Sequence, residues 1–392
     1  MSTLLIHSGT LLTPFEAIED GALFVRDGLI ERVGARSAVG EHADVEIDAR
    51  AELICPGFID LQVNGGGGVL LTDEPAVAAV ARMARAHTKF GTTSMLPTIV
   101  TAPEDRLAEG LSAVRDATGK PMGGARILGS HMEGPFISVV RKGAHDERFI
   151  RQPDAELFVR LLEAADGTLR IVTIAPELPH ALDLYHLATG SHTVVSIGHT
   201  DATYEEAQRG IEAGATFSTH VFNAMRPLSQ RDPGVIGAVL ESDRVTGGII
   251  PDAVHVHPSV LALIARAKGV ERTALVTDAM PPVGAPSPEF LLEHRRITVR
   301  DGACYTDDGV LAGSALSMNE AVRRMHELAG LPLIDCVRMA TETPARVLAL
   351  QNEIGVLKPG AKADVVICDE HIVIDKVIVA GETVYSASNV SS

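Results

Sequence analysis

The chain has 392 residues, of which 46% are hydrophobic and 22% are charged, and this is the composition of a folded globular protein rather than of a disordered or fibrous one. Its formal net charge of −17 argues against the broad basic surface that binds nucleic acid or an anionic membrane. Four widely spaced cysteines without a CxxC pair indicate neither a disulfide framework nor a thiolate metal site. The sequence shows no signal peptide and no apolar run near the roughly 18 residues that span a bilayer. We therefore expect a cytoplasmic protein that binds neither nucleic acid nor membrane.

Both ends of the chain consist of short apolar, β-rich runs joined by turns. The runs are residues 4–6, 21–25, 29–30 and 45–47 near the N-terminus, and 363–367, 373–374 and 376–379 near the C-terminus. Asp27-Gly28 and Ala380-Gly381 are typical hairpin turns. This pattern predicts a small β-sandwich domain built from residues 1–53 and 352–392.

Between residues 54 and 351, β-rich runs alternate with segments of helical period, as in βα units around a parallel sheet. The candidate strands are residues 54–61, 92–97, 126–132, 170–175, 193–198, 215–219, 247–251 and 273–277. Eight such units favour a (β/α)8 TIM barrel, an α/β fold, over an open doubly wound sheet. No G-x-G-x-x-G motif opens a helix after the first strand, so we expect no dinucleotide site.

Ionisable residues stand at the carboxyl ends of most of these strands. They are Asp60, Glu133, Glu177, His199, His220, Asp252, His255 and Asp278. Enzymes with this fold work at that end of the barrel. The sequence therefore predicts a single active site at one mouth of the barrel.

Glu133, His199 and His220 form a His2Glu set, which suits zinc or another divalent ion with an open position for water. Such an ion lowers the pKa of its water to about 7 and polarises a carbonyl oxygen. Asp278 is then the predicted proton shuttle of an amide hydrolysis. Taken singly, each histidine is also compatible with a structural hydrogen bond, and Asp278 with a helix N-cap. The prediction rests on the four residues occurring together.

Several motifs, in this order along the chain, resemble those of the N-acetylglucosamine-6-phosphate deacetylases of the amidohydrolase superfamily. They are Pro56–Asp60, His131–Phe136, Gly198–Thr200, Thr219–Met225, Thr277–Met280, Leu311–Ser314 and Gly355–Asp364. The resemblance covers nearly the whole chain. It implies a metal-dependent hydrolase that removes acetate from N-acetylglucosamine 6-phosphate, on a barrel with a β-sandwich formed by both termini.

Carried over by position, the resemblance places the metal ligands on Glu133, His199 and His220 and the catalytic acid/base on Asp278. It places substrate contacts on Ala144, His145, Asn223, Ala224, Arg231, Asp252, His255 and the loop of Leu311, Ala312 and Gly313. The backbone N–H groups of Asn223 and Ala224, with Arg231 and His255, are expected to hold the phosphate. His145 is expected to bind the sugar or to stabilise the oxyanion.

Two departures from related sequences matter. Gln62 and Asn64 occupy the positions where many amidohydrolases carry His-x-His, so we expect one divalent ion per subunit, zinc first, with iron, cobalt or manganese as alternatives. Ala253 stands where relatives more often have glycine, which puts the contacts of the adjoining Asp252–His255 segment in doubt.

Three questions stay open at the level of sequence. Some relatives in this family form dimers, so we expect a homodimer in which Arg231 and His255 act either within their own chain or across the interface. The substrate is alternatively another phosphorylated amino sugar, such as N-acetylgalactosamine 6-phosphate. A rival from a different class is a catalytically inactive amidohydrolase-fold scaffold.

Overall fold

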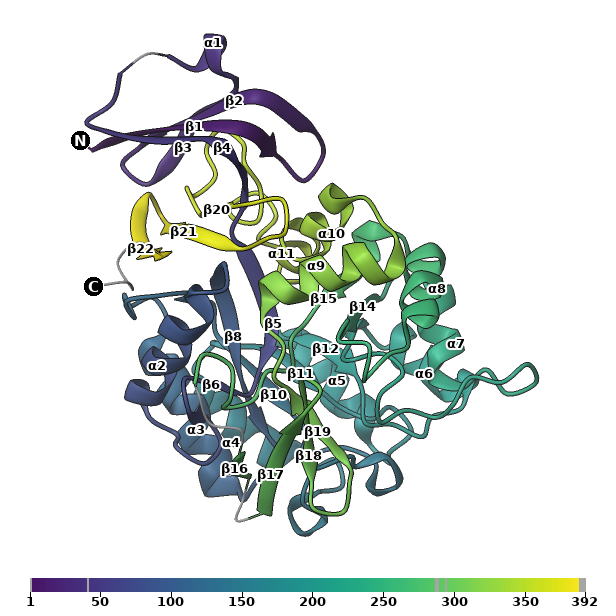
Figure 1. The fold of residues 1–392 in the computed structure, drawn as a ribbon. Coiled ribbons are helices and arrows are strands. Elements are labelled where there is room, and N and C mark those ends of the chain that lie inside the picture. The colour runs from purple at the N-terminus through teal and green to yellow at the C-terminus, as the bar shows by residue number, and fades with distance from the viewer. Residues whose placement is uncertain (1, 41, 286–288, 293–294, 388–392) are drawn as a thin grey trace.

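The computed structural model describes residues 2–40, 42–285, 289–292 and 295–387 (Figure 1). Its centre is a ring of eight parallel strands, which confirms the predicted TIM barrel. In ring order these are β5 (Phe58–Val63), β8 (Thr92–Val100), β10 (Ser130–Glu133), β11 (Leu169–Thr173), β12 (Val194–Ile197), β13 (Ala215–Ser218), β14 (Thr246–Ile249) and β15 (Thr273–Leu275). A short β9 (Arg126–Ile127) also pairs with β8.

The ring closes between its first and last strands. Val63 and Ala279 form an isolated parallel bridge, and the Asp278 N–H donates to the Gln62 carbonyl at 3.0 Å. All six residues of β5 are buried, as expected of a parallel strand covered on both faces. The closure brings the carboxyl ends of β5 and β15 side by side.

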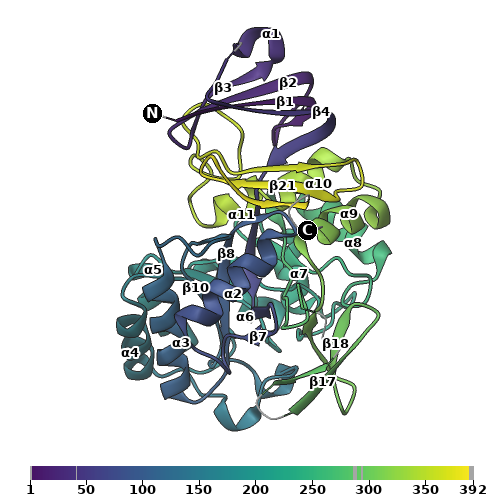
Figure 2. The same cartoon turned by 60° about the vertical axis from the view of Figure 1, so that its left-hand side comes forward.

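Helices surround the ring (Figures 1 and 2). They are α2 (Val77–Thr88), α3 (Glu104–Ala117), α4 (Ala155–Ala165), α5 (Ala181–Gly190), α6 (Tyr204–Glu212), α7 (Gly234–Glu241), α8 (Pro258–Lys268), α9 (Met318–Ala329), α10 (Leu333–Met339) and α11 (Glu342–Val347). One side of α2 shows the packing, because Val80, Met83 and Ala84 are fully buried against the strands. None of the helices in the described part of the chain is long and apolar enough to cross a membrane.

The two termini together build a second, seven-stranded sheet. Its order is β22 (Glu382–Ser386), β21 (Ile374–Val379), β20 (Val365–Cys368), β4 (Val45–Pro56), β1 (Thr3–Leu12), β2 (Ala17–Arg26) and β3 (Leu29–Ala35), with a short α1 (Arg36–Val39) after β3. Residues from both ends of the chain, such as Ile6 and Ile378, share one separate hydrophobic core. Figure 2 shows β1 to β3 as one layer and β21 next to the barrel. The domain limits at residues 53 and 352 stay a prediction.

Both predicted hairpin turns are present. Asp27 and Gly28 have φ of 49° and 79° between β2 and β3, and Ala380 and Gly381 have φ of 49° and 81° between β21 and β22. Positive φ at both central positions is the geometry that matches the twist of a two-residue hairpin.

A buried ion pair joins the terminal sheet to the barrel. The Arg126 guanidinium donates to both carboxylate oxygens of Asp364, at 2.6 and 3.0 Å. Asp364 is 2% exposed, and its Oδ1 also accepts from the Ala380 N–H at 2.8 Å. The pair thus links the start of β9 to the segment that enters β20.

A four-stranded antiparallel sheet, which the sequence analysis did not predict, lies between β15 and α9. It consists of β16 (Glu289–Leu292), β17 (Arg295–Arg300), β18 (Ala303–Thr306) and β19 (Leu311–Ser314). The segment taken as a loop at residues 311–313 is therefore part of strand β19. Its strands are only four to six residues long, and few of their side chains, such as Ile297 and Cys304, are fully buried, so the apolar alternation that marks a strand is weak.

Candidate active site

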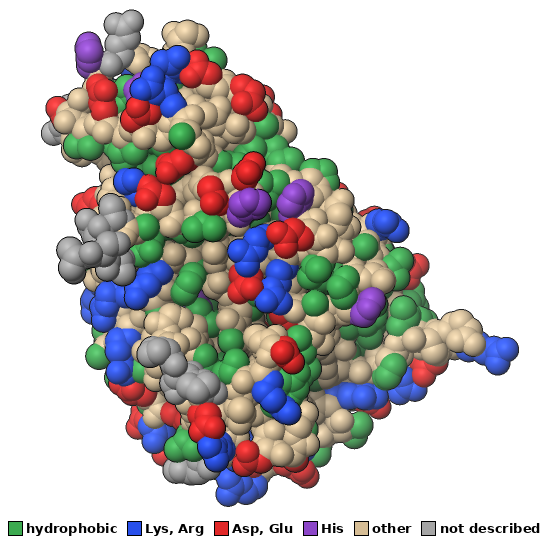
Figure 3. Space-filling model, viewed as in Figure 1, with side chains coloured by type: hydrophobic (Ala, Val, Ile, Leu, Met, Phe, Trp, Pro, Cys, Tyr) green, Lys and Arg blue, Asp and Glu red, His purple; other side chains and the backbone are tan. Residues whose placement is uncertain are grey.

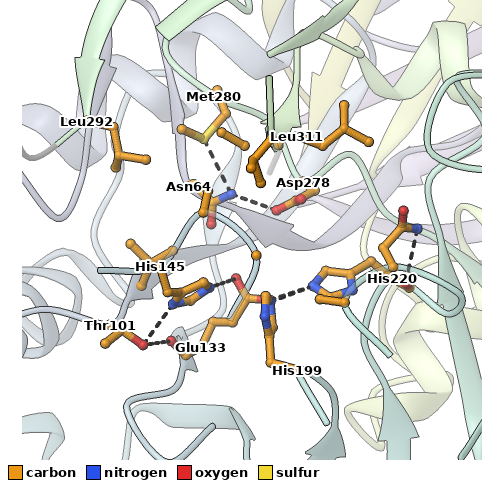
Figure 4. Close-up of a pocket in the computed structure, with 18 of the residues that line it drawn as sticks. Asn64, Thr101, Glu133, His145, His199, His220, Asp278, Met280, Leu292 and Leu311 are labelled. Atoms are coloured by element: carbon orange, nitrogen blue, oxygen red, sulfur yellow. Dashed lines mark hydrogen bonds and ion pairs between the residues drawn. The ribbon is translucent and has the colours of Figure 1, made fainter. Parts of the chain in front are cut away.

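A pocket opens at the carboxyl ends of the barrel strands and gathers most of the predicted site residues (Figure 4). Those that line it are Glu133, Ala144, His145, His199, His220, Asn223, Ala224, His255, Asp278, Leu311, Ala312 and Gly313. Asn64, Thr101, Met280, Leu292 and Arg295 complete much of the wall. Two predicted residues, Arg231 and Asp252, do not line it.

Three of the predicted metal ligands converge on one point. The Nε2 of His220 lies 2.9 Å from Glu133 Oε1 and 3.1 Å from His199 Nε2, and His199 Nε2 lies 3.3 Å from the same Glu133 oxygen. Ligand atoms around a tetrahedral zinc ion, with bonds near 2.0 to 2.1 Å, stand roughly 3.3 Å apart. The three atoms therefore have the chemistry and the spacing of a divalent-metal site.

The orientation of His199 supports this arrangement. Its Nδ1 lies 3.0 Å from the Arg141 carbonyl oxygen, which can only accept, so Nδ1 carries the proton. The Nε2 lone pair then faces Glu133, as in metal-ligating histidines held by a backbone carbonyl. His220 differs, because its Nδ1 is buried without a partner among the described residues.

His145 stands beside this cluster. Its ring centroid lies 4.4 Å from that of His199, and its Nε2 lies 3.9 Å from Glu133 Oε2. Glu133, His145 and His199 therefore also form a group whose ligand atoms all fall within 4.8 Å of one another. We favour His220 as the third ligand because its Nε2 lies 2.9 Å from Glu133 and 3.1 Å from His199, whereas His145 Nε2 is 3.9 Å from Glu133 Oε2.

The backbone is held in an unusual conformation at the residues that face the pocket. His199, His220 and Asp278 have φ of 47°, 24° and 52°. Side chains other than glycine rarely adopt positive φ, and such outliers cluster at functional sites. Each turn lets a strand end and its last side chain point into the mouth of the barrel.

The buried ionisable groups of the pocket differ in how readily they hold a proton. Burial alone would raise the pKa of Glu133, but hydrogen bonds and charge from His199 and His220 hold it well below its usual range. Burial, together with the charge of Glu133, raises the pKa of Asp278. Burial and the charge of His199 lower the pKa of His145 to about 3. The site therefore pairs one firmly ionised carboxylate with a second carboxyl that holds a proton more readily and with a neutral imidazole.

The structure places His255 in the pocket of its own chain. Its Nδ1 lies 2.6 Å from Asp252 Oδ2, and the same carboxylate accepts from the backbone N–H groups of Val254 and His255. Asp252 thus orients His255 from behind. Ala253 has a φ of 64°, a conformation that favours glycine, yet these bonds are formed around it.

Two of the predicted phosphate donors are not offered to the pocket of their own chain. The backbone N–H of Asn223 donates to the His220 carbonyl at 2.9 Å and is not free, because the chain makes a tight turn after His220. The neighbouring Ala224 N–H has no acceptor among the described residues. Arg231 is exposed and lies outside the pocket, because the loop between β13 and α7 carries it away from the barrel. Figure 1 shows this loop projecting from the molecule, and Figure 3 shows cationic side-chain atoms at the tip of the projection.

Sequence reasoning missed Arg295, the one Lys or Arg side chain that lines the pocket within the described residues. It lies on β17, and its Nη2 donates to the Ala144 carbonyl at 2.5 Å, next to His145. No sequence motif marks it, because its place in the pocket depends on the unpredicted sheet.

Asp60 lies beneath the site, fully buried, and its Oδ2 accepts from the Thr277 hydroxyl at 2.5 Å. Burial raises its pKa from 3.8 to about 7, so the unfolded chain loses this proton near pH 4 whereas the folded chain keeps it to about pH 7. The contribution of Asp60 to the free energy of unfolding is thus fully present below pH 4 and is lost as the pH rises through 7. The total loss is at most about 4 kcal/mol.

We expect the free energy of unfolding of wild type to fall relative to that of Asp60→Asn between pH 4 and pH 7. Unfolding midpoints of the two proteins, measured across this range, test the effect. Parallel pH profiles for both proteins would contradict it.

Comparison with known proteins adds independent findings. A model described as the amidohydrolase family matches residues 53–384. The chain is 34% identical to an N-acetylgalactosamine-6-phosphate deacetylase of Escherichia coli, covering 97% of this chain and 99% of that protein. It is 34% identical to an N-acetylglucosamine-6-phosphate deacetylase of Bacillus subtilis, covering 93% of each.

Solved structures are similar over nearly the full length. One is an N-acetylglucosamine-6-phosphate deacetylase mutant from Mycobacterium smegmatis in complex with N-acetyl-D-glucosamine-6-phosphate, with a TM-score of 0.92 and 35% identity over 98% of this chain and 100% of that chain. Another is the N-acetylglucosamine-6-phosphate deacetylase from Pasteurella multocida, with a TM-score of 0.92 and 33% identity over 97% of this chain and 99% of that chain.

Proposed function

Because the chain belongs to the amidohydrolase family, we propose that it hydrolyses the N-acetyl group of N-acetylglucosamine 6-phosphate to acetate and glucosamine 6-phosphate. The observation that carries this proposal is the convergence of Glu133, His199 and His220 to within 3.3 Å, in a pocket that Asp278 also lines. An inactive scaffold has no need of this arrangement. The galactosamine epimer is the second candidate substrate, since relatives of equal similarity carry that name.

Glu133, His199 and His220 are the residues that would hold one divalent ion, with zinc ahead of iron, cobalt and manganese. When bound, such an ion supplies Lewis-acid activation of the acetyl carbonyl and of a water molecule. The amides at Gln62 and Asn64 are poor ligands beside imidazole, which supports a single ion.

Asp278 is the proposed general base and acid. It accepts a proton from the attacking water as the new carbon–oxygen bond forms, and it returns that proton to the nitrogen as the carbon–nitrogen bond breaks. Its raised pKa suits a carboxyl that must hold the proton between these two steps. Neutral His145, whose Nδ1 lies 2.8 Å from the Thr101 hydroxyl, is the proposed stabiliser of the developing oxyanion.

The phosphate would lie at the end of the pocket lined by Ala224 and His255. The free Ala224 N–H and the His255 ring, oriented by Asp252, are the donors within the chain. We propose that the protein is a homodimer and that the projecting loop brings Arg231 to the partner's phosphate end. A cytoplasmic location fits the four cysteines, all buried free thiols.

The test is acetate release by purified protein of measured metal content. We expect one divalent ion per chain and rapid turnover of N-acetylglucosamine 6-phosphate, with little turnover of the unphosphorylated sugar. Faster turnover of the galactosamine epimer would move the assignment to the second candidate. Absence of stoichiometric metal and of turnover with all three sugars would favour the scaffold.

A further inference from the structure

Two buried side-chain amides, Gln62 and Asn64, stand between the groups that the proposed mechanism uses. They follow each other at alternate positions at the end of β5 and therefore point to the same side. Gln62 Nε2 donates to Glu133 Oε1 at 2.9 Å and to Asp278 Oδ1 at 3.1 Å. Asn64 Nδ2 donates to the same Asp278 oxygen at 2.7 Å (Figure 4).

The orientation of both amides is determined by their surroundings. Gln62 Oε1 accepts a hydrogen bond from the Thr219 hydroxyl, so the nitrogen end of the amide must face the two carboxylates. For Asn64, a flipped amide would put its carbonyl oxygen against Asp278 Oδ1, an oxygen that already accepts a hydrogen bond from Gln62 Nε2. Each nitrogen is therefore a donor to Asp278.

Asn64 is a poor candidate for a merely structural residue. It is 3% exposed, and its carbonyl oxygen is buried without a partner among the described residues. A structural asparagine in the interior normally has both halves of its amide paired. Apart from a 3.6 Å contact with the Met280 sulfur, the polar contacts of this side chain are directed at Asp278 alone.

Two N–H groups donate to Asp278 Oδ1, and neither of them can accept a proton from it. Protonation of this oxygen is therefore unfavourable. Among the described residues, Asp278 Oδ2 has no hydrogen-bond donor. Building on the function proposed above, we propose that Gln62 and Asn64 are positioning residues that hold Asp278 Oδ1 as a permanent acceptor and so confine the transferred proton to Oδ2. The proton passes from the attacking water to Oδ2, and from Oδ2 to the departing nitrogen.

Asn64 gives the sharper test, because Gln62 also contacts Glu133, a proposed metal ligand. We expect Asn64→Ala to lower kcat by about 100-fold, the effect of misplacing a catalytic group by about 1 Å. KM and the metal content per chain should stay near those of wild type. In an Asp278→Asn background the same substitution should cause no further loss, because Asn64 acts through Asp278.

Two comparisons make the test specific. Asn319→Ala is the matched control. It removes a different asparagine hydrogen bond, from Nδ2 to the Ile372 carbonyl at 3.1 Å, which lies away from the pocket, and it should leave kcat unchanged. Gln62→Met keeps length and removes both donors, and it replaces Asn64→Ala if that variant does not fold. Equal losses in the wild-type and Asp278→Asn backgrounds would overturn the proposal.

A crystal structure of the Asn64→Ala variant provides a readout that does not depend on activity. The proposal predicts that the Asp278 carboxylate rotates from its wild-type position, and an unmoved carboxylate would overturn it. If wild type itself releases no acetate, the proposed function fails while this structural comparison still decides the positioning role. If wild type is active and the two substitutions are additive, only the positioning role fails.

Discussion

Replacing Asp278 by asparagine should reduce kcat for deacetylation by about 1,000-fold, within the range that general acid–base groups supply. The new amide has nearly the same shape, so the fold and the Glu133, His199 and His220 cluster should be retained. It cannot accept a proton from water or return one to the amine. Steady-state kinetics at saturating substrate, together with metal content, measure the effect.

Asp335→Asn, in the first turn of α10 and away from the pocket, is the matched control and should turn over normally. Loss of metal along with activity would show that the substitution disturbs the ligand cluster rather than the proton transfer. Near-normal turnover of Asp278→Asn would remove Asp278 from the mechanism.

Replacing Arg126 by methionine should destabilise the protein by about 3 to 5 kcal/mol, because it leaves a buried carboxylate without its cation. Asp364 is 2% exposed, and after the change its carboxylate accepts a hydrogen bond only from the Ala380 N–H among the described residues. The loss should appear as a lower unfolding midpoint in a thermal scan. Acetate release at low temperature should persist, since the pair does not line the pocket.

A second substitution distinguishes two causes of this destabilisation, the loss of the ion-pair attraction and the cost of leaving a buried charge unpaired. In the Arg126→Met background, Asp364→Asn removes the charge and still accepts from the Ala380 N–H, so part of the stability should return. If Arg126→Met costs less than about 1 kcal/mol, the pair behaves as a surface ion pair and the prediction is wrong.

Much of the fold was predictable from the sequence because parallel barrel strands are buried on both faces. Such strands are rich in apolar residues, and all six residues of β5 are buried, including the polar Asp60 and Gln62. The hairpin at Asp27-Gly28 was predictable for a different reason, since both positions need positive φ. The convergence of Glu133, His199, His220 and Asp278 was predictable because each stands at the end of a strand of one ring or within three residues after it, and the strand ends of a ring converge.

Other features depend on contacts that no local pattern reveals. The strands from β16 to β19 are only four to six residues long and lack a clear apolar alternation, so the sheet was not predicted and Arg295 was missed with it. The Asn223 N–H was predicted to hold the phosphate, but in the turn after His220 it donates to the His220 carbonyl. The sequence shows that Gln62 and Asn64 stand where many relatives have histidine. Their hydrogen bonds to Asp278 could not be predicted, because they depend on how the ring closes.

The small antiparallel sheet and the barrel strands contribute different parts of the pocket wall, and this separation matters for redesign. Leu292, Arg295 and Leu311 come from one continuous insertion, whereas the proposed metal ligands come from three separate barrel strands. The insertion is joined to the ring near Asp278, where the Ser314 N–H donates to the Asp278 carbonyl at 3.0 Å. A library confined to residues 289–292, 296–300 and 303–311 would therefore reshape the entrance that faces the sugar, while Arg295 keeps its bond to the Ala144 carbonyl and the hydrolytic centre, built elsewhere in the chain, keeps its geometry.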